Sequence, residues 1–293
     1  MQILDGKATA AAVRREITDA VAERSATGER PPHLAAILVG SNPASEAYVR
    51  NKVKDCAAVG FESSLFRFEA SVSEAVLLDQ IRRVNDDPGI DGLIVQLPLP
   101  DHISAVRVTE TIDPRKDVDG FHPGNVGRMV LGLPTYLPAT PYGIVELLRR
   151  YEIDTSGMRA VVVGRSHIVG SPMSVLLARN ANPGNATVTL CHSRTRDLPA
   201  LLREADLIVA ALGRPGFIGA DQVKEGAVVI DVGITRVADS TKMSGWALRG
   251  DVAYDEVAPR CRAITPVPGG VGPMTRAGLL LNTLAAARGE VYG

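Results

Sequence analysis

VVVGRSHIVGSP (161–172) is the stretch of sequence that decides the fold. Its valines are typical of the end of a buried parallel strand, and the glycines behind them lead into a helical pattern. A Rossmann fold has this order of strand, turn and helix where it places a pyrophosphate on a helix N-terminus. Ser166 stands where the middle glycine of G-x-G-x-x-G would be, between Gly164 and Gly170, so the motif is incomplete. A tight turn that binds no ligand is the alternative interpretation.

Short apolar runs alternate with helical patterns on both sides of this stretch, which indicates α/β layers. The apolar runs predict strands at 33–40, 61–68, 92–100, 159–164, 186–191, 205–213 and 226–233. The helical patterns predict helices at 8–26, 43–59, 73–86, 142–151, 171–181, 197–204 and 274–289. One of these helices has a clear start, with Asn42 as its N-cap and Pro43 in its first turn.

The length of 293 residues favours two domains. Residues 113–141 are rich in proline and glycine and show no clear period, so we expect them to connect the domains. The resulting division is an N-terminal α/β domain over 1–138 and a Rossmann-type dinucleotide-binding domain over 139–273. We expect the C-terminal segment 274–293 to return and complete the first domain.

The composition excludes several classes of protein. A net charge of −1 offers no clustered basic excess for a nucleic acid or a membrane surface, so we expect neither as a partner. The three cysteines are odd in number and far apart, and neither they nor the five histidines have the spacing of metal ligands. The N-terminus lacks the apolar region of a secretory signal, and no apolar run approaches the roughly 18 residues of a membrane span. These features predict a cytoplasmic protein without a bound metal.

The residues after the next strand bear on which dinucleotide binds. That strand ends about 20 residues beyond the glycine loop, where NAD enzymes usually place an acidic residue on the ribose hydroxyl. Here Ser193 and Arg194 stand at that point, and Arg165 lies in the loop itself. A carboxylate would repel a 2′-phosphate, whereas guanidinium groups can hold it, so we predict NADP over NAD. A solvated strand end is the alternative.

SEAYVRNK (45–52) places Tyr48 and Lys52 four residues apart, on one face of the predicted helix. The pair is either an ordinary exposed pair or half of an active site, and these eight residues alone favour the former. Gln96 is a polar amide in the apolar run GLIVQLPLP (92–100), and it either satisfies a nearby loop or orients a group at the strand end.

Two loops can likewise be interpreted as structural or as functional. Asp119 in KDVDGFHP (116–123) either caps backbone N–H groups or accepts two hydrogen bonds from a heterocycle such as a pterin. PVPGGVGPMT (266–275) contains Pro268, Gly269 and Gly270, and it is either a domain hinge or a wall that lets ligands approach the backbone closely.

Segments in order along nearly the whole chain carry a resemblance to a known family. They are LDGK (4–7), SEAYVRNK (45–52), VNDDPGIDGLIVQLPLP (84–100), KDVDGFHP (116–123), GRSHIVGSP (164–172), CHSRT (191–195), GDVAYDEV (250–257) and TPVPGGVGPMT (265–275). The longer segments are specific. On them the chain resembles the bifunctional methylenetetrahydrofolate dehydrogenase/cyclohydrolase family.

The resemblance implies a folate site in a cleft between an N-terminal folate-binding domain and the Rossmann domain, and a homodimer as the assembly. It implies that Tyr48 lies beside the folate, that Lys52 is the key catalytic group, that Gln96 orients this lysine and that Asp119 anchors the pterin. The residues that match dinucleotide contacts of the family are Gly164, Arg165, Ser166, Ser193 and Ile234, and those that match the substrate loop are Pro268, Gly269 and Gly270.

Two positions depart from the family pattern. Ala139 in PATP (138–141) stands where the family often has a cysteine, and Arg276 stands where relatives tend to have an aliphatic residue. Neither change touches the proposed reactive residues, so local packing or a ligand contact is what they put in question.

The resemblance implies two reactions on tetrahydrofolate one-carbon derivatives. Hydride leaves the methylene bridge of 5,10-methylenetetrahydrofolate, and water then opens the methenyl product to 10-formyltetrahydrofolate. Only the second step moves protons through a positioned acid or base, so we expect Lys52 to matter more to the cyclohydrolase step. A monofunctional dehydrogenase and a non-catalytic binding protein are the alternatives.

Overall fold

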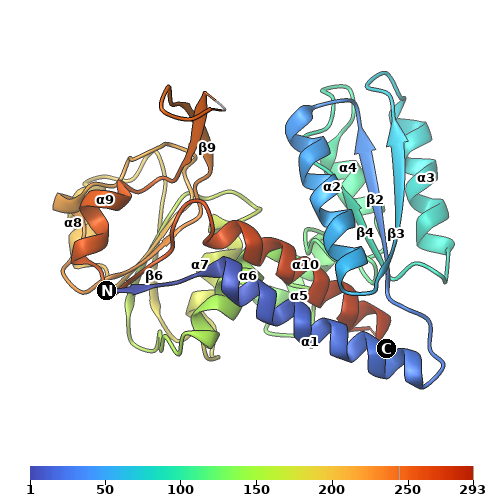
Figure 1. Cartoon of the computed structure of the whole chain (residues 1–293), viewed down its shortest axis with the longest axis horizontal. Helices are drawn as coiled ribbons and strands as arrows, with labels where there is room; N and C mark the ends of the chain where they lie inside the picture. The colour runs from blue at the N-terminus through green and yellow to red at the C-terminus, as the bar shows by residue number, and fades with distance from the viewer. Residues whose placement is uncertain (244, 293) are drawn as a thin grey trace. The chain divides into compact units, whose positions relative to one another are not determined.

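The computed structural model describes residues 1–243 and 245–292, and it divides into two compact units (Figure 1). The three-stranded unit comprises Ala11–Ala139 and Arg276–Gly293, and the six-stranded unit comprises Met1–Ala10 and Thr140–Thr275. Gly293, the last residue of the predicted segment 274–293, lies outside the described residues.

The three-stranded unit is built on a parallel sheet with the order β3-β2-β4. The central strand β2 (His33–Val39) is buried from Leu34 onward, which explains its unbroken apolar sequence. β3 (Glu62–Phe68) lies at one edge and alternates between exposed and half-buried residues, and β4 (Gly92–Val95) lies at the other. Figure 1 shows β2 and β3 side by side, with α2 (Pro43–Ala58) and α3 (Glu74–Asp86) beside them.

The helices of this unit follow from their sequence patterns. Asn42 caps α2 by accepting from the backbone N–H groups of Ala44 and Ser45, and Pro43 occupies the first turn, so the predicted helix start is confirmed. The buried residues of α3 recur at helical spacing and pack with α4 (Ala105–Thr111) and with β2 and β4 around one apolar core.

The predicted irregular connection over 113–141 contains a helix that the proline and glycine content concealed. α5 (Pro123–Val130) begins where the His122 ring accepts from the backbone N–H of Gly124, with Pro123 as its first residue. The long helix α1 (Gly6–Ala26) begins in the six-stranded unit, and α10 (Val271–Ala287) continues from that unit into the three-stranded one.

The six-stranded unit contains one parallel sheet with the order β1-β11-β8-β7-β5-β6. The strands are β1 (Gln2–Ile3), β5 (Arg159–Val163), β6 (Thr187–Cys191), β7 (Leu207–Ala210), β8 (Val228–Asp231) and β11 (Ala263–Ile264). From β5 the chain first builds β6 on one side and then β7 on the other. Such a reversal of strand order leaves a crevice at the carboxyl ends of the strands, which is the ligand site of open α/β sheets.

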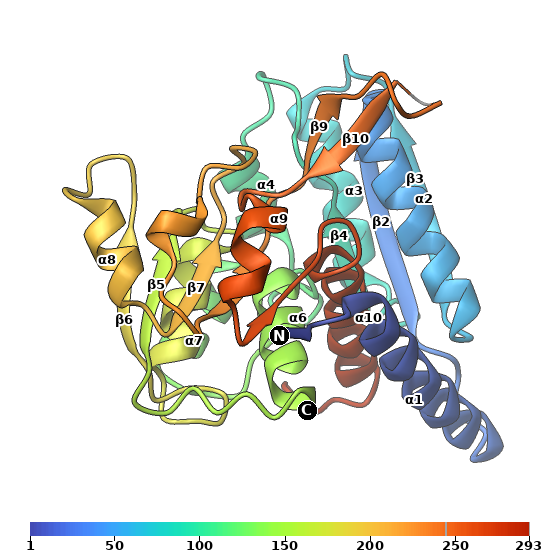
Figure 2. The same ribbon diagram turned by 60° about the vertical axis from the view of Figure 1, so that its left-hand side comes forward.

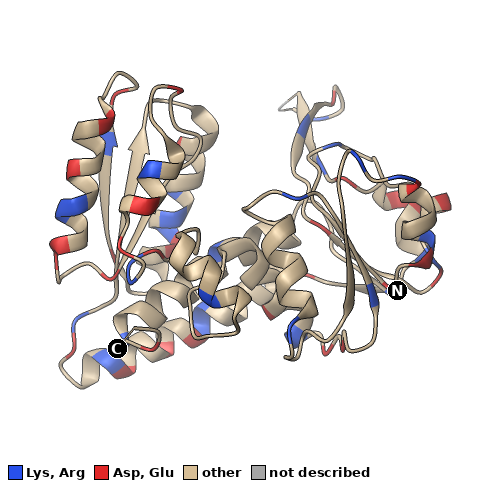
Figure 3. Ribbon diagram, turned by 180° about the vertical axis from the view of Figure 1, so that it is seen from behind, with Lys and Arg blue, Asp and Glu red and all other residues tan. Residues whose placement is uncertain are grey.

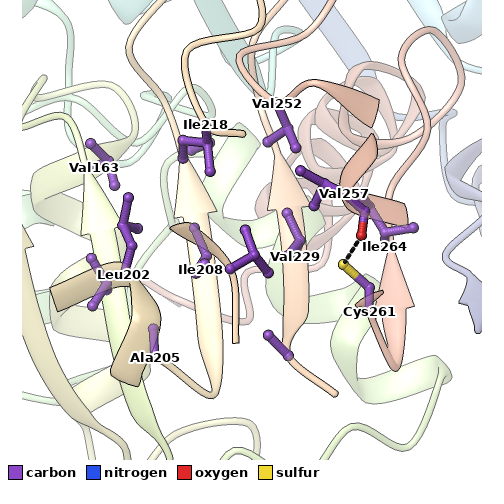
Figure 4. Packing of buried hydrophobic residues seen from close by; sticks show 14 of the residues in the cluster. Val163, Leu202, Ala205, Ile208, Ile218, Val229, Val252, Val257, Cys261 and Ile264 are labelled. Carbon is purple, nitrogen blue, oxygen red and sulfur yellow. Dashed lines mark hydrogen bonds between the residues drawn. The ribbon is translucent and has the colours of Figure 1, made fainter. Parts of the chain in front are cut away.

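Apolar residues from the strands and from the segments after them fill the core of this unit (Figure 4). Val163, Ile208, Val229 and Ile264 come from four different strands, and all four are almost wholly buried. In the same cluster the Cys261 thiol donates to the carbonyl of Val257, so this buried sulfur has a partner.

The remaining elements complete the six-stranded unit. They are α6 (Ala139–Arg150), α7 (Gly170–Ala178), α8 (Leu198–Glu204), α9 (Tyr254–Val257), the 3₁₀ turns Ala220–Gln222 and Ala258–Arg260, and the strands β9 (Thr235–Ala238) and β10 (Trp246–Arg249). β9 and β10 form a separate antiparallel hairpin (Figure 2), in which the Arg236 guanidinium lies 4.4 Å from the centre of the Trp246 ring. Two units with parallel sheets and surrounding helices confirm the predicted α/β fold class.

Charged residues of both signs are interspersed along the helices and loops (Figure 3). Over residues 1–243 and 245–292, no helix combines the length and the apolar character needed to cross a bilayer.

Candidate active site

Lys52 lies at the centre of a polar group in the three-stranded unit. Its Nζ atom is 3.5 Å from Oε1 of Gln96 and 3.9 Å from Oδ1 of Asp119. The Lys52 side chain is 12% exposed and that of Asp119 is 16% exposed, so the charges are shielded from water but remain accessible. Two residues distant from Lys52 in sequence therefore converge on its ammonium group.

Gln96 reaches this position because it follows directly on β4. Its backbone N–H donates to the carbonyl of Ile37, which extends the pairing with β2 by one residue. Its side-chain Nε2 donates to the carbonyl of Leu97 at 2.7 Å. Because the nitrogen end of the amide is held in this way, the oxygen end faces Lys52.

Asp119 is placed by a segment that runs beside β4. The backbone N–H of Leu93 donates to the carbonyl of Lys116, and Leu93 also pairs with Asp117. The next residue after Asp119 is Gly120, with φ +74° and only 2.6 Å between an added Cβ and the Leu137 carbonyl carbon, so no other residue fits there. The backbone on both sides of the Asp119 carboxylate is thus fixed.

A buried network lies behind this segment. Asp117 is 1% exposed and accepts from Nδ2 of Asn125 and from the backbone N–H groups of Phe121 and His122. Burial raises the pKa of Asp117 above its usual range, against the opposing effect of these donors. The Tyr292 hydroxyl donates to Oδ1 of the same Asn125, so the end of the chain contributes to the network.

Tyr48 lies one turn before Lys52 on α2 and is 46% exposed. The spacing puts both side chains on one helix face, and the ring is accessible to a flat ligand beside the lysine. The structure therefore brings together Lys52, Gln96 and Asp119 and leaves Tyr48 open at the same face.

The glycine loop of the six-stranded unit connects β5 to α7. Gly164 has φ +115°, and a Cβ there would lie 2.1 Å from the carbonyl oxygen of Ala211. A Cβ on Gly170 would lie 1.8 Å from the carbonyl oxygen of Gly164. The Ser166 hydroxyl accepts from the backbone N–H of Val169 at 3.1 Å. The outer glycines are required by close backbone packing, and the serine at the middle position closes the turn that precedes α7.

The turn after β6 holds Ser193 between two hydrogen bonds. The backbone N–H of His192 donates to the Thr195 hydroxyl, and that of Arg194 donates to Nδ1 of His192. Ser193, Arg194 and Arg165 are exposed, and none of the ion pairs within the described residues involves either arginine. The turn thus offers hydroxyl and guanidinium groups with no carboxylate at the strand end.

Ile234 follows β8 and is 48% exposed. Two buried carboxylates, which sequence reasoning did not identify, shape the loops around it. Asp231 accepts from the backbone N–H groups of Gly233, Asp251 and Val252, and Asp251 accepts from those of Leu212, Gly213 and Arg214. The available signal was an aspartate at the end of an apolar run with a glycine two residues later, VVIDVG (228–233). Burial and the nearby Asp251 raise the pKa of Asp231 to about 6 despite its three donors.

The loop with Pro268, Gly269 and Gly270 follows β11. The backbone N–H of Gly270 donates to the carbonyl of Pro266, and the backbone N–H of Lys7 donates to that of Gly269. Gly6 packs so tightly here that a Cβ on it would lie 1.7 Å from the Gly270 carbonyl oxygen. The loop is fixed from both sides, with Pro268 exposed.

The predicted ligand residues of the six-stranded unit share one edge of its sheet. The segments that carry them follow the carboxyl ends of β5, β6, β8 and β11, and these strands are parallel. This is the edge at which open α/β sheets bind nucleotides.

Two family models match the chain. The catalytic domain of tetrahydrofolate dehydrogenase/cyclohydrolase matches residues 4–119, and the NAD(P)-binding domain of the same family matches residues 138–291.

Relatives match over the full length. The bifunctional protein FolD of Phocaeicola vulgatus is 60% identical over 292 residues, which cover 100% of each chain. The crystal structure of the bifunctional FolD enzyme from Campylobacter jejuni is 45% identical and superposes with a TM-score of 0.93 over 99% of each chain. The Trypanosoma brucei methylenetetrahydrofolate dehydrogenase-cyclohydrolase, solved with NADP and an inhibitor, is 40% identical with a TM-score of 0.92 over 99% of this chain and 98% of that one. Sequence and fold agree from end to end, and the chain belongs to the tetrahydrofolate dehydrogenase/cyclohydrolase family.

Proposed function

We propose that this protein oxidises 5,10-methylenetetrahydrofolate to 5,10-methenyltetrahydrofolate with NADP and then hydrolyses the product to 10-formyltetrahydrofolate. The observation that carries the proposal is the convergence of Lys52 with Gln96 and Asp119, in a chain that matches bifunctional relatives along its whole length. The protein then acts in folate one-carbon metabolism.

In the hydride-transfer step the main role of the protein is to position the folate and the dinucleotide. Hydride leaves the methylene carbon for the nicotinamide of NADP, and the neighbouring folate nitrogens supply electron density as it departs. In this proposal Asp119 accepts hydrogen bonds from the pterin and Tyr48 lies along the folate. Pro268, Gly269 and Gly270 form a loop wall whose backbone a ligand can approach.

The hydrolysis step requires proton transfer. Lys52 supplies a basic side chain at the convergent site, and Gln96 fixes its direction through Oε1. We assign to Lys52 the transfer of a proton as water adds to the methenyl carbon and the ring opens. Tyr48 and Asp119 then hold the substrate so that its methenyl carbon lies close to Lys52.

The residues of the six-stranded unit suit a 2′-phosphorylated dinucleotide. Gly164, Arg165 and Ser166 begin the turn at the end of β5, and Ser193 stands at the end of β6, where a carboxylate would select NAD. Exposed guanidinium groups of Arg165 and Arg194 can hold a phosphate. Ile234 offers an apolar surface at the same sheet edge.

We also propose that residues 1–138 with 274–293 carry the folate chemistry and that 139–273 bind the dinucleotide. The protein is expected to act in the cytoplasm as a homodimer, without a metal, nucleic acid or membrane partner. Three buried free thiols and a net charge of −1 support the compartment and the absence of polyanionic partners.

The test is reduction of NADP⁺ and of NAD⁺ by the purified protein with 5,10-methylenetetrahydrofolate. Turnover is expected with NADP⁺, with at least about tenfold higher kcat/KM than with NAD⁺. Ser193→Asp introduces the carboxylate that is usual in NAD enzymes, and it is expected to reverse the preference for NADP⁺ over NAD⁺. The matched control is Ser156→Asp, an exposed position before β5 and therefore at the opposite sheet edge. Turnover with neither dinucleotide would refute the dehydrogenase assignment, and a preference for NAD⁺ would refute the cofactor argument alone.

A further inference from the structure

A second charged pair lies one turn beyond Lys52 on α2. Asp55 is 9% exposed, and its Oδ2 atom lies 2.9 Å from Nη1 of Arg276 on α10. The Asp55 side chain is 13% exposed and that of Arg276 is 29% exposed, so the pair is largely withdrawn from water. Arg276 is the position at which the family resemblance predicted an aliphatic residue.

The two charges depend on each other. Oδ2 of Asp55 is buried and accepts no hydrogen bond of good geometry within the described residues, although the Arg276 guanidinium is at ion-pair distance. The compensation of this carboxylate is therefore the electrostatic attraction of one arginine. Removal of one member of a buried pair leaves the other uncompensated, which is the costly situation.

Lys52 and Asp55 share a helix face, because residues three apart are neighbours on a helix surface. The Cys56 thiol, next to Asp55 in the sequence, is affected by the charges of both Asp55 and Lys52. Burial, together with the Asp55 carboxylate, raises the pKa of Cys56 to about 12, and the Lys52 ammonium opposes this rise. The charge of Asp55 thus acts in the same shielded region as the ammonium that faces Gln96.

We propose that Arg276 is a positioning residue for Lys52: by neutralising Asp55, it keeps the Lys52 ammonium directed toward Gln96 and Asp119. Without Arg276, the Asp55 carboxylate competes with Asp119 for the lysine and holds it as an unreactive ammonium. Without Asp55, Lys52 loses a nearby carboxylate that favours its charged form, and the Arg276 guanidinium that paired with Asp55 is left uncompensated. The inference rests on the proposed cyclohydrolase role of Lys52.

The groups that face Lys52 define the expected pH dependence. On α2 they are Tyr48, Asp55 and the protonated thiol of Cys56. From other elements Asp119, in the loop beside β4, lies at ion-pair distance from Lys52, and Gln96 is the neutral partner. Arg276 on α10 pairs with Asp55 and acts on Lys52 through that carboxylate. Of these, only Asp55 and Arg276 are changed in the test.

The test compares Arg276→Leu, Asp55→Asn and the double variant by titration of the lysine side chains. The chain has six lysines, so ¹³C-labelled lysine gives few signals, and Lys52→Met identifies the one from Lys52. We expect the Lys52 titration midpoint to rise by about one pH unit in Arg276→Leu and to fall by a similar amount in Asp55→Asn. The double variant is expected to return to the wild-type midpoint.

Hydrolysis of 5,10-methenyltetrahydrofolate provides the second measurement. At neutral pH the rate is expected to fall about tenfold in Arg276→Leu and to recover in the double variant, with NADP⁺ reduction changed much less. The matched control is Arg288→Leu, which removes an arginine just after α10 that pairs with Glu290.

Two results would overturn the inference. One is that both single variants move the Lys52 midpoint in the same direction, as a merely structural defect would. The other is that Arg276→Leu leaves the midpoint where it was. A wild-type protein without cyclohydrolase activity would instead refute the proposed function, and the lysine titration would still decide whether Arg276 and Asp55 act on Lys52.

Discussion

Asp231 shows how one buried carboxylate holds the loops at the predicted ligand-binding edge of the six-stranded unit, the edge at the carboxyl ends of its strands. It is 2% exposed and accepts from three backbone N–H groups, one of them in the turn that leads to Ile234. Burial nevertheless raises its pKa to about 6 from the usual 3.8. The folded protein therefore holds this proton more tightly than the unfolded chain does.

A pH dependence of stability follows from this shift. Between about pH 3.8 and 6 the folded state binds the proton and the unfolded state does not, so the contribution of Asp231 is complete below this window and is lost as the pH rises through it. The loss is at most about 3 kcal/mol. Urea unfolding from pH 4 to 7 is expected to show wild type losing stability relative to Asp231→Asn.

Asp206 provides a control of opposite sign. Its pKa is lowered, first by a hydrogen bond from Lys224, so its contribution is gained as the pH rises. The stability of wild type relative to Asp206→Asn should therefore increase over the acid range. A difference between wild type and Asp231→Asn that is constant with pH would contradict the account.

Single residues set the limit of what the sequence could predict at the site. The helix spacing of Tyr48 and Lys52 was predictable, because it depends on local geometry. The approach of Gln96 and Asp119 to Lys52 depends on which strands pair, and here only the family resemblance pointed to it. The Asp55–Arg276 pair joins two helices, and no local pattern predicts such a contact.

At the scale of elements, length decided which predictions were confirmed. β2, β3 and β5 have five to seven residues each, and they were found within a residue or two of their predicted ends. β1 and β11 have two residues each and pair across most of the chain, so they carry no periodic signal. The strand predicted over 92–100 ends at Val95, because the prolines that follow lack the N–H needed to continue the ladder.

α10 fixes the backbone on which Asp119 depends. Asn282 is 3% exposed, and its Nδ2 donates at 2.8 Å to the carbonyls of Val118 and of Leu137. Asn282→Leu removes both bonds, from the carbonyl of the buried Val118 and from that of the half-buried Leu137. We expect a loss of about 2–4 kcal/mol in the free energy of unfolding, measured by urea denaturation.

Asn282→Leu is also expected to raise the KM for the folate substrate, because Val118 directly precedes Asp119, the proposed pterin contact. Asn51→Leu is the matched control, since this residue is exposed on α2 and its replacement should change stability by less than about 0.5 kcal/mol. An Asn282→Leu variant as stable as Asn51→Leu would show that α10 does not support the Asp119 segment.

For the whole molecule, the function rests on features of both units. The three-stranded unit carries Lys52, Gln96 and Asp119, and the six-stranded unit carries the predicted nucleotide-binding edge, without a carboxylate at the end of β6. Bulk composition could exclude classes of partner, but it could not indicate a folate. That inference needed motifs spread over nearly the whole chain, and the full-length match to bifunctional relatives supports it.

The most direct test of the account separates the two reactions at Lys52. Hydrolysis of 5,10-methenyltetrahydrofolate, corrected for its spontaneous rate, is to be compared with NADP⁺ reduction in wild type, Lys52→Met and the exposed neighbour variant Lys54→Met. We predict that Lys52→Met lowers hydrolysis by about 10²–10⁴-fold and hydride transfer by far less, with Lys54→Met close to wild type in both. Full cyclohydrolase activity in Lys52→Met would contradict the account.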